Sequence, residues 1–140
     1  IVHNPQLRNK IDVDFFRSSC CERTIISLRR RAKYIIAELS GEKALLLHLG
    51  MTGKFRIVDQ NTEVKKHEHV LFELDNETSW RYEDARRFGV VNVVTLTVKG
   101  ALPESLEHLG PEPLEELFTA KYLKDYCKNK TKPIFIECNP

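Results

Sequence analysis

The sequence predicts a mainly β protein: an antiparallel β-sandwich or flattened barrel with a flanking α-helix near the C-terminus. Apolar residues alternate with polar ones through most of the chain, and turn-forming residues separate the alternating runs. Alternation with a period of two is typical of strands with one buried face. Six or seven short strands at such spacing favour a sandwich or barrel, and helical signals after Gly100 add the helix.

The predicted strands follow one another with short connections. Gly41, Gly53, Gly89 and the pair Asp75-Asn76 mark turns or bulges between them. The last strand is expected to be longer than the others and buried on both faces. In chain order the strands are expected at residues 24–28, 33–39, 43–49, 54–57, 69–74, 78–82 and 90–98.

Two helical segments are predicted beyond Gly100. A short one covers residues 103–109, where Gly110-Pro111 stops it. A longer one has Thr119 as its N-cap. This helix is supported by the apolar stripe Tyr122, Leu123, Tyr126 and Cys127 and by Lys128 and Lys130, whose charge favours a helix carboxyl end.

Length and composition indicate one globular domain. Of 140 residues, 41% are hydrophobic and 30% are charged, which argues against both disorder and a membrane protein. No apolar run reaches the roughly 18 residues of a membrane span. The start, Ile1-Val2-His3-Asn4-Pro5, lacks the basic and apolar stretches of a secretory signal. The domain is expected over residues 1–128, with the beginning of a linker over residues 129–140.

The cysteines indicate reduced thiols in a cytosolic protein. None of them has C-x-x-C spacing, and two adjacent cysteines bond to each other only with strain. The sequence therefore argues against a zinc site built from Cys20, Cys21, Cys127 and Cys138.

Positive charge is clustered, although the formal net charge of +2 is too small to indicate a nucleic-acid partner by itself. A solvated face is the alternative for any single cluster. The clusters are Arg29-Arg30-Arg31 with Lys33; Lys65-Lys66-His67; Arg81 with Arg86 and Arg87; and Lys121, Lys124, Lys128, Lys130 and Lys132.

Two glycine-containing blocks point most directly to a function. They are His48-Leu49-Gly50-Met51-Thr52-Gly53 and Asp84-Ala85-Arg86-Arg87-Phe88-Gly89. Each places one large apolar side chain near a glycine at an expected turn, and the second adds two guanidiniums. A thioether, a ring and arginines exposed together suit a surface that wedges into stacked bases and holds phosphates. The alternative is that Met51 and Phe88 are ordinary core residues.

Five blocks occur in the order found in one protein family. Together they resemble the N-terminal domain of bacterial formamidopyrimidine-DNA glycosylase, an enzyme that removes oxidised purines such as 8-oxoguanine and cleaves the strand at AP sites. The resemblance runs to about Ile134, and the sister endonuclease VIII branch matches less well at the Met51 and Phe88 blocks. The blocks are Arg30-Arg31-Ala32-Lys33-Tyr34; residues 48–53; Lys66-His67-Glu68-His69-Val70; Arg81-Tyr82 with residues 84–89; and Leu109-Gly110-Pro111-Glu112-Pro113-Leu114.

The resemblance implies a DNA-binding cleft. Lys33 matches a family lysine that donates a proton in the elimination and contacts a phosphate. His48, His67 and Lys130 match positions that contact DNA. A surface position is the alternative for Lys33, and a surface or core position is the alternative for the histidines. His67 and His69 share a strand face, but a metal site would need a third ligand, so no metal is expected.

The resemblance also implies a base-replacing trio. Met51, Arg86 and Phe88 match the residues that fill the space left by an extruded base. A guanidinium at Arg86 suits bidentate donation to the orphaned partner base.

The sequence departs from the family at both ends. The family nucleophile is the amine of an N-terminal proline, followed by a glutamate acid. Here the chain opens with Ile1, so about two dozen family residues, including one helix, are missing, and Pro5 is internal. The helix-two-turns-helix module and zinc finger are missing too. Zinc is expected only in that finger, and no cofactor is expected here. Residues 135–140 do not follow the family pattern, and Ala85 replaces a proline, which would loosen that turn.

The sequence thus predicts a base-excision DNA repair protein that is inactive by itself. Its expected partner is double-stranded DNA with an oxidised base or an AP site, with no membrane partner. A monomer is expected, in a bacterial-type cytoplasm and associated with the nucleoid. The alternatives are a non-catalytic DNA-binding fragment and a structural remnant with uncovered apolar sheet surface.

Overall fold

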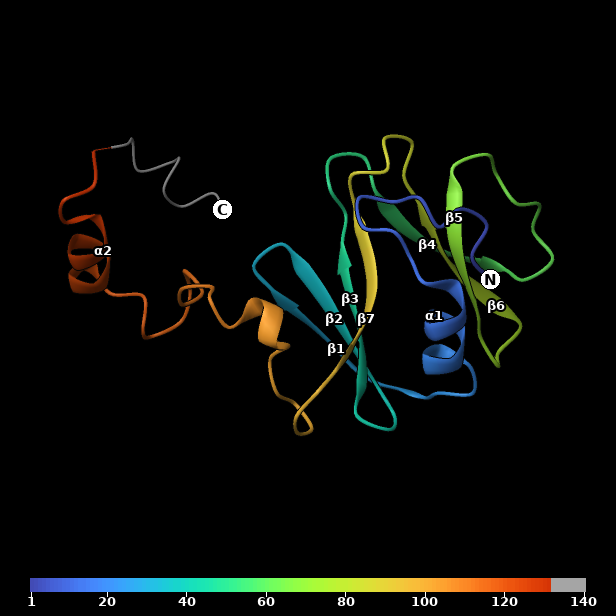
Figure 1. Cartoon of the computed structure of the whole chain (residues 1–140), viewed down its shortest axis with the longest axis horizontal. Helices are drawn as coiled ribbons and strands as arrows, with labels where there is room; N and C mark the ends of the chain where they lie inside the picture. Colours follow the sequence, from blue (N-terminus) through green and yellow to red (C-terminus); the bar gives the residue numbers. More distant parts are fainter. Residues whose placement is uncertain (132–140) are drawn as a thin grey trace. The chain divides into compact units, whose positions relative to one another are not determined.

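Two antiparallel sheets form the first part of the chain, with strand orders β1-β2-β3-β7 and β4-β6-β5 (Figure 1). The computed structural model describes residues 1–131, and the chain divides into two units, Ile1–Glu107 and His108–Pro140. The elements are α1 (Val13–Cys20), β1 (Ile25–Arg31), β2 (Tyr34–Leu39), β3 (Lys43–His48), β4 (Lys54–Asp59), β5 (Glu68–Glu73), β6 (Thr78–Glu83), β7 (Val90–Thr95), the 3-10 turn η1 (Glu104–Leu106) and α2 (Ala120–Cys127).

Both sheets bury side chains in one core, which confirms the predicted mainly β fold with a helix near the C-terminus. The alternating positions of β2, β3 and β7 supply one side of this core, and β5 and β6 supply the other. No helix within the described residues is long and apolar enough to cross a membrane. The core residues are Leu7, Ile11, Phe16, Ala37, Leu39, Leu45, Leu47, Val70, Tyr82, Val91 and Val93.

The helix α1 was not predicted from the sequence. Asp12 is its N-cap and accepts a hydrogen bond from the Phe15 backbone N–H at 3.0 Å. The buried Phe16 ring lies 5.9 Å from the Phe72 ring of β5, so the helix contributes to the core. An aspartate three residues before an aromatic pair was the available signal, because aspartate is a preferred N-cap.

Several strand predictions need correction. β1 continues past the predicted end at Leu28 to Arg31, because Arg29–Arg31 pair with β2. β3 ends at His48, one residue early, because the Leu49 carbonyl turns to accept from the Gly53 N–H at 2.9 Å. β7 ends at Thr95, and Asn92 is exposed, so the prediction of a long strand buried on both faces is wrong. The physical reason is that β7 is an edge strand, whereas the central strands β2 and β3 carry the two-sided burial.

The second unit contains the predicted helix. Thr119 is the N-cap of α2 and accepts from the Tyr122 N–H at 3.0 Å. The other predicted helical segment, 103–109, is reduced to the single turn η1 of the first unit. The predicted linker falls outside the described residues from position 132 onward, as do Lys132, residues 135–140 and Cys138. The predicted boundary after residue 128 stays a prediction.

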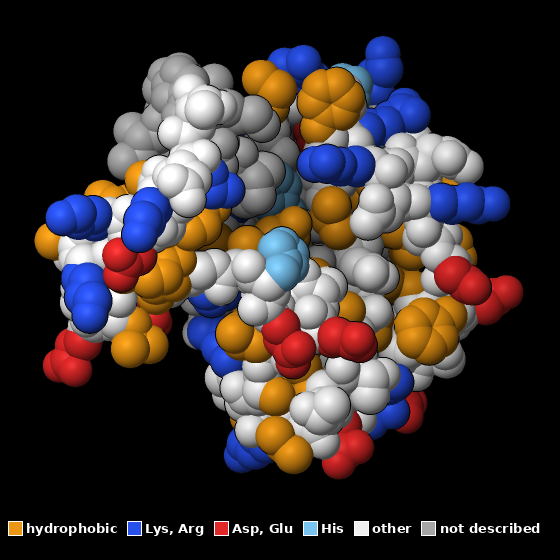
Figure 2. Space-filling model, turned by 60° about the vertical axis from the view of Figure 1, so that its left-hand side comes forward, with side chains coloured by type: hydrophobic (Ala, Val, Ile, Leu, Met, Phe, Trp, Pro, Cys, Tyr) orange, Lys and Arg blue, Asp and Glu red, His pale blue; other side chains and the backbone are white. Residues whose placement is uncertain are grey.

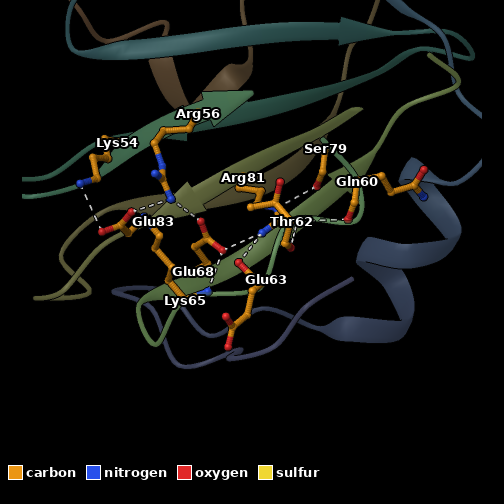
Figure 3. Close-up of polar contacts among 10 residues, drawn as sticks. All are labelled: Lys54, Arg56, Gln60, Thr62, Glu63, Lys65, Glu68, Ser79, Arg81 and Glu83. Atoms are coloured by element: carbon orange, nitrogen blue, oxygen red, sulfur yellow. Dashed lines mark hydrogen bonds and ion pairs between the residues drawn. The ribbon is translucent and has the colours of Figure 1, made fainter. Parts of the chain in front are cut away.

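An ion-pair network joins β4, β5 and β6 (Figure 3). Arg81 and Glu68 are almost completely buried, and Arg81 Nη1 lies 3.1 Å from Glu68 Oε2. Arg56 Nη2 lies 2.6 Å from the other Glu68 oxygen and 3.3 Å from Glu83 Oε2. The network ends at Lys54, whose Nζ lies 3.2 Å from Glu83 Oε1.

Arg81 therefore has a structural position, and its assignment to a basic surface cluster is wrong. Its neighbours in β6, Trp80 and Tyr82, belong to the core, so Arg81 lies on the opposite face of the strand. The β4–β5 loop covers it there, which sequence alternation alone could not reveal. Its guanidinium donates to the Ser79 hydroxyl and to the carbonyls of Gln60, Thr62 and Glu63.

The edge strand β1 leaves apolar side chains uncovered. Leu28 pairs with the fully buried Ala37, yet 61% of Leu28 is exposed. Ile26 is exposed as well. On the opposite face of β1, the Arg29 guanidinium donates to the Ala101 carbonyl. This hydrogen bond connects the segment before η1 to β1.

Candidate nucleic-acid interface

The two glycine-containing blocks lie side by side at one end of the sandwich. Residues 49–53 connect β3 to β4, and residues 84–89 connect β6 to β7 (Figure 1). The register pairs His48 with Val90, which brings the two loops together. Gly50 has φ +63°, and a Cβ there would lie 2.7 Å from the Gly89 nitrogen. Only glycine permits this backbone approach.

The large apolar side chains of both loops are exposed. Met51 is 71% exposed and Phe88 is 47% exposed, so the alternative of ordinary core packing is wrong for both. Arg86 is also exposed, and its guanidinium carbon lies 4.7 Å from the centre of the Phe88 ring. This is the distance of a cation–π contact. Figure 2 shows hydrophobic side chains beside Lys and Arg side chains along the upper edge of the drawn face.

A buried carboxylate, Asp84, connects the two loops through hydrogen bonds. Asp84 is completely buried, and its Oδ1 accepts from the Thr52 hydroxyl at 2.5 Å and from the Arg86 N–H at 3.2 Å. Its Oδ2 accepts from the Tyr82 hydroxyl at 3.0 Å and from the Gly89 N–H at 2.9 Å. Burial by itself raises the pKa of Asp84, but these hydrogen bonds outweigh burial and lower it. The Asp84 carboxylate is therefore held ionised.

A separate basic group surrounds the end of β3. The His48 Nδ1 accepts from the Gly50 N–H at 3.0 Å, so the proton of the neutral ring is on Nε2. Partial burial and the charges of Lys33 and Arg8 lower the pKa of His48. Lys33 is exposed in the β1–β2 turn, and Arg8 is exposed in the turn closed by the Gln6–Lys10 bridge. Three chain segments thus bring donors for an anion together.

Of the remaining predicted site residues, His67 lies next to the start of the 84–89 loop, and Lys130 lies in the second unit. His67 is half-buried beside β5, and its carbonyl accepts from the Asp84 N–H at 3.0 Å. His69 is buried, with Nε2 2.8 Å from the Asp84 carbonyl oxygen, so this nitrogen is already engaged. Lys130 belongs to the second unit, where its Nζ lies 5.3 Å from the Tyr126 ring centre. Within residues 1–131, no cluster of three His, Cys, Asp or Glu side chains has metal-binding geometry.

Sequence reasoning missed several residues that build this site. The sequence pattern gives Asp84 no role beyond the start of a block and Thr52 none beyond its place next to Met51. Tyr82 and Arg8 were not considered for the site. An aspartate two residues before an arginine in a turn was an available signal, because Asp commonly accepts from the N–H two residues on.

The fold and the paired loops define a two-sheet β domain with an exposed apolar and basic end. The family model for the formamidopyrimidine-DNA glycosylase N-terminal domain matches residues 1–91, and the chain belongs to this family. The formamidopyrimidine-DNA glycosylase of Enterobacter sp. (strain 638) is 39% identical over 134 residues, which are 96% of this chain and 48% of that protein. The enzyme of Rickettsia bellii (strain OSU 85-389) is 38% identical over 128 residues, which are 91% of this chain and 46% of that protein.

Solved structures show the same fold. The Lactococcus lactis formamidopyrimidine-DNA glycosylase bound to DNA with an AP site matches with a TM-score of 0.80 and 24% identity, covering 98% of this chain and 53% of that one. The same enzyme with FAPY-dG DNA gives a TM-score of 0.81, and the match covers 96% of this chain and 49% of that one. The chain therefore spans about half the length of the relatives it matches.

Proposed function

We propose that this chain is the DNA-gripping β-sandwich of a base-excision repair enzyme. The family activity is the excision of oxidised purines, 8-oxoguanine and formamidopyrimidines, with strand cleavage at the resulting AP site. One observation carries the proposal: Met51 and Phe88, which a core would normally bury, are exposed on adjacent loops together with Arg86. The substrate is double-stranded DNA with an oxidised base or an AP site.

The physical case rests on the cost of extruding a nucleotide. Flipping a base out of the duplex costs a few kcal/mol of stacking and pairing. A thioether and a ring that enter the gap restack on its neighbours, and each stacking contact recovers about 1–3 kcal/mol. The Arg86 guanidinium lies over Phe88, where it can donate to the orphaned partner base as the ring enters.

The basic group at the end of β3 is assigned to the phosphate backbone. His48 presents Nε2–H, and Lys33 and Arg8 add positive charge from two other segments. Lys33 is also the assigned proton donor of the elimination step. Further DNA contacts are assigned to His67 and Lys130. The Lactococcus lactis relatives are bound to DNA that carries AP sites or a damaged base, which supports the partner class.

The 140-residue polypeptide is proposed to bind DNA without excising a base. The Ile1 nitrogen donates to the Leu71 carbonyl at 2.6 Å. The Leu71 N–H in turn donates to the Ile1 carbonyl at 2.8 Å, so this end pairs with the edge strand β5. The assigned setting is the nucleoid in the cytoplasm of a bacterial-type cell.

The test compares two duplexes of one sequence, one intact and one with a tetrahydrofuran abasic-site analogue. Tighter binding of the second duplex is expected by fluorescence anisotropy. With about four phosphate contacts, log affinity should fall with log salt with a slope of roughly −3 to −4. Equal affinity for both duplexes would contradict the proposal. Borohydride trapping on 8-oxoguanine DNA should yield no covalent product, and a trapped product would overturn the assigned inactivity.

A second candidate is a structural remnant that associates through its uncovered surface. The exposed Ile26 and Leu28 on β1 favour it. Sizing over a range of concentrations separates the two candidates, since the remnant should self-associate and the DNA-binding domain should stay monomeric.

A further inference from the structure

Asp84 receives hydrogen bonds from four other residues. Its two oxygens accept from the hydroxyls of Thr52 and Tyr82 and from the backbone N–H groups of Arg86 and Gly89. All four donors are uncharged. A buried carboxylate is expensive to desolvate, and four converging donors are what make such a position stable.

The pattern of these bonds closes the loop that carries Phe88. Asp84 binds the N–H of Arg86 with one oxygen and the N–H of Gly89 with the other, so residues 86–89 are held at both ends. Arg87 lies between them with φ +59°, a left-handed conformation that costs energy for a residue with a Cβ. The carboxylate therefore holds a loop conformation that the loop residues do not favour by themselves.

Thr52 extends this arrangement to the loop that carries Met51. Its hydroxyl donates to Asp84 Oδ1 at 2.5 Å and accepts from the Arg86 N–H at 3.3 Å. Thr52 directly follows Met51, so one exposed hydroxyl links the backbone beside the thioether to the backbone beside the guanidinium. This cross-loop contact is separate from the register of β3 and β7.

We propose that Asp84 and Thr52 are positioning residues that hold Met51, Arg86 and Phe88 as one preformed element for insertion at a missing base. This inference rests on the proposed function. Loops whose backbone is ordered before binding lose less conformational entropy on insertion. The effect falls on recognition of the gap, because the phosphate-binding group at Lys33, His48 and Arg8 is not part of this arrangement.

The experiment uses Thr52→Val, because Thr52 is exposed and valine keeps its shape while removing the hydroxyl. Thr52→Ser restores the hydroxyl, and Thr62→Val makes the same change at an exposed residue of the β4–β5 loop. The readout is the ratio of dissociation constants for intact and tetrahydrofuran duplexes. We expect Thr52→Val to lower this ratio roughly 10-fold or more, the effect of one hydrogen bond to a charged group. The other two variants should stay within about 2-fold of wild type, and every salt slope should be unchanged.

A second measurement requires no DNA. Backbone ¹⁵N order parameters of Met51, Arg86 and Phe88 are measured in the free protein. They should fall from about 0.85, the value of a rigid backbone, toward about 0.6 in Thr52→Val and in no other variant. Wild-type order parameters in Thr52→Val would overturn the inference even if DNA binding follows the proposed function. A loosened loop with an unchanged discrimination ratio would also overturn it. A wild-type protein that does not discriminate between the duplexes overturns the proposed function and this inference together.

Discussion

Two buried charges close together on the chain serve different ends. Arg81 lies within β6 and is 1% exposed, and Asp84 lies just after β6 and is fully buried. Arg81 is compensated by the Glu68 carboxylate and by loop carbonyls, whereas Asp84 is compensated by neutral hydroxyls and N–H groups. The first arrangement attaches a covering loop to the sheet. The second supports a loop whose side chains stay exposed.

Burial of a charge does not by itself indicate a functional site. Around Arg81 the partners enclose the charge, and the attached loop hides it (Figure 3). Around Asp84 three of the four partners, Thr52, Arg86 and Gly89, belong to the loops that present Met51 and Phe88 to solvent. The chemistry of the exposed neighbours, rather than the buried charge, distinguishes the two regions.

We expect the largest effect when the buried Arg81–Glu68 ion pair is removed. Arg81→Met leaves part of the Glu68 carboxylate buried without its partner, and we expect a loss of about 3–5 kcal/mol in the free energy of unfolding. Urea denaturation measures it. Lys54→Met removes the partly exposed end of the same network and should cost less than about 1 kcal/mol. Similar losses for both variants would show that the buried pair has no special weight.

The next effect concerns the exposed side of the Asp84 region. Phe88→Ala should weaken binding to the tetrahydrofuran duplex about 5- to 150-fold, the loss of one base-stacking contact. Its stability should change little, since the ring is half exposed. Leu28→Ala removes an even more exposed apolar side chain on β1 and should leave DNA binding unchanged. Equal losses in the two variants would contradict the assignment of Phe88.

The pH dependence of stability tests whether the charge on Asp84 stabilises the folded protein. The pKa of Asp84 is lowered in the folded protein, so its ionisation contributes stability above its ordinary pKa of 3.8. This contribution is lost as pH falls below about 4 through the folded-state pKa. Asp84→Asn should therefore be less stable than wild type at pH 7, and the difference in stability between the two proteins should become smaller toward pH 3. A stability difference that does not change with pH, measured by urea midpoints, would contradict ionised Asp84 as its source.

The smallest effect tests the phosphate-binding group, which neither buried charge touches. Lys33→Met should reduce the magnitude of the salt slope by about 0.9, the value for one phosphate contact. Lys43→Met, at the opposite end of β3 from His48, is the matched control and should leave the slope at its wild-type value. An unchanged slope in Lys33→Met would remove Lys33 from the interface.

Sequence reasoning recovered most of the fold because strand signals are local. Alternation, a β-branched run at residues 24–28 and an apolar run at residues 90–98 together identified all seven strand regions, and Thr119 identified the start of α2. The errors occurred where neighbours in space decide the outcome. Asn92 is exposed because β7 is an edge strand, and Arg81 is buried because a loop covers the outer face of β6.

The two glycine-containing blocks could be identified from the amino-acid sequence, because a glycine near a large apolar residue at a turn is a short-range pattern. The exposure of Met51 and Phe88 required the folded structure. The sequence by itself also determined the family, since five blocks in order need no coordinates. Only the tertiary structure decided that Asp84 and Thr52 hold the blocks together and that Arg8 joins Lys33 and His48. These contacts join residues far apart in the chain, and whether a polar side chain is buried or exposed depends on what folds over it.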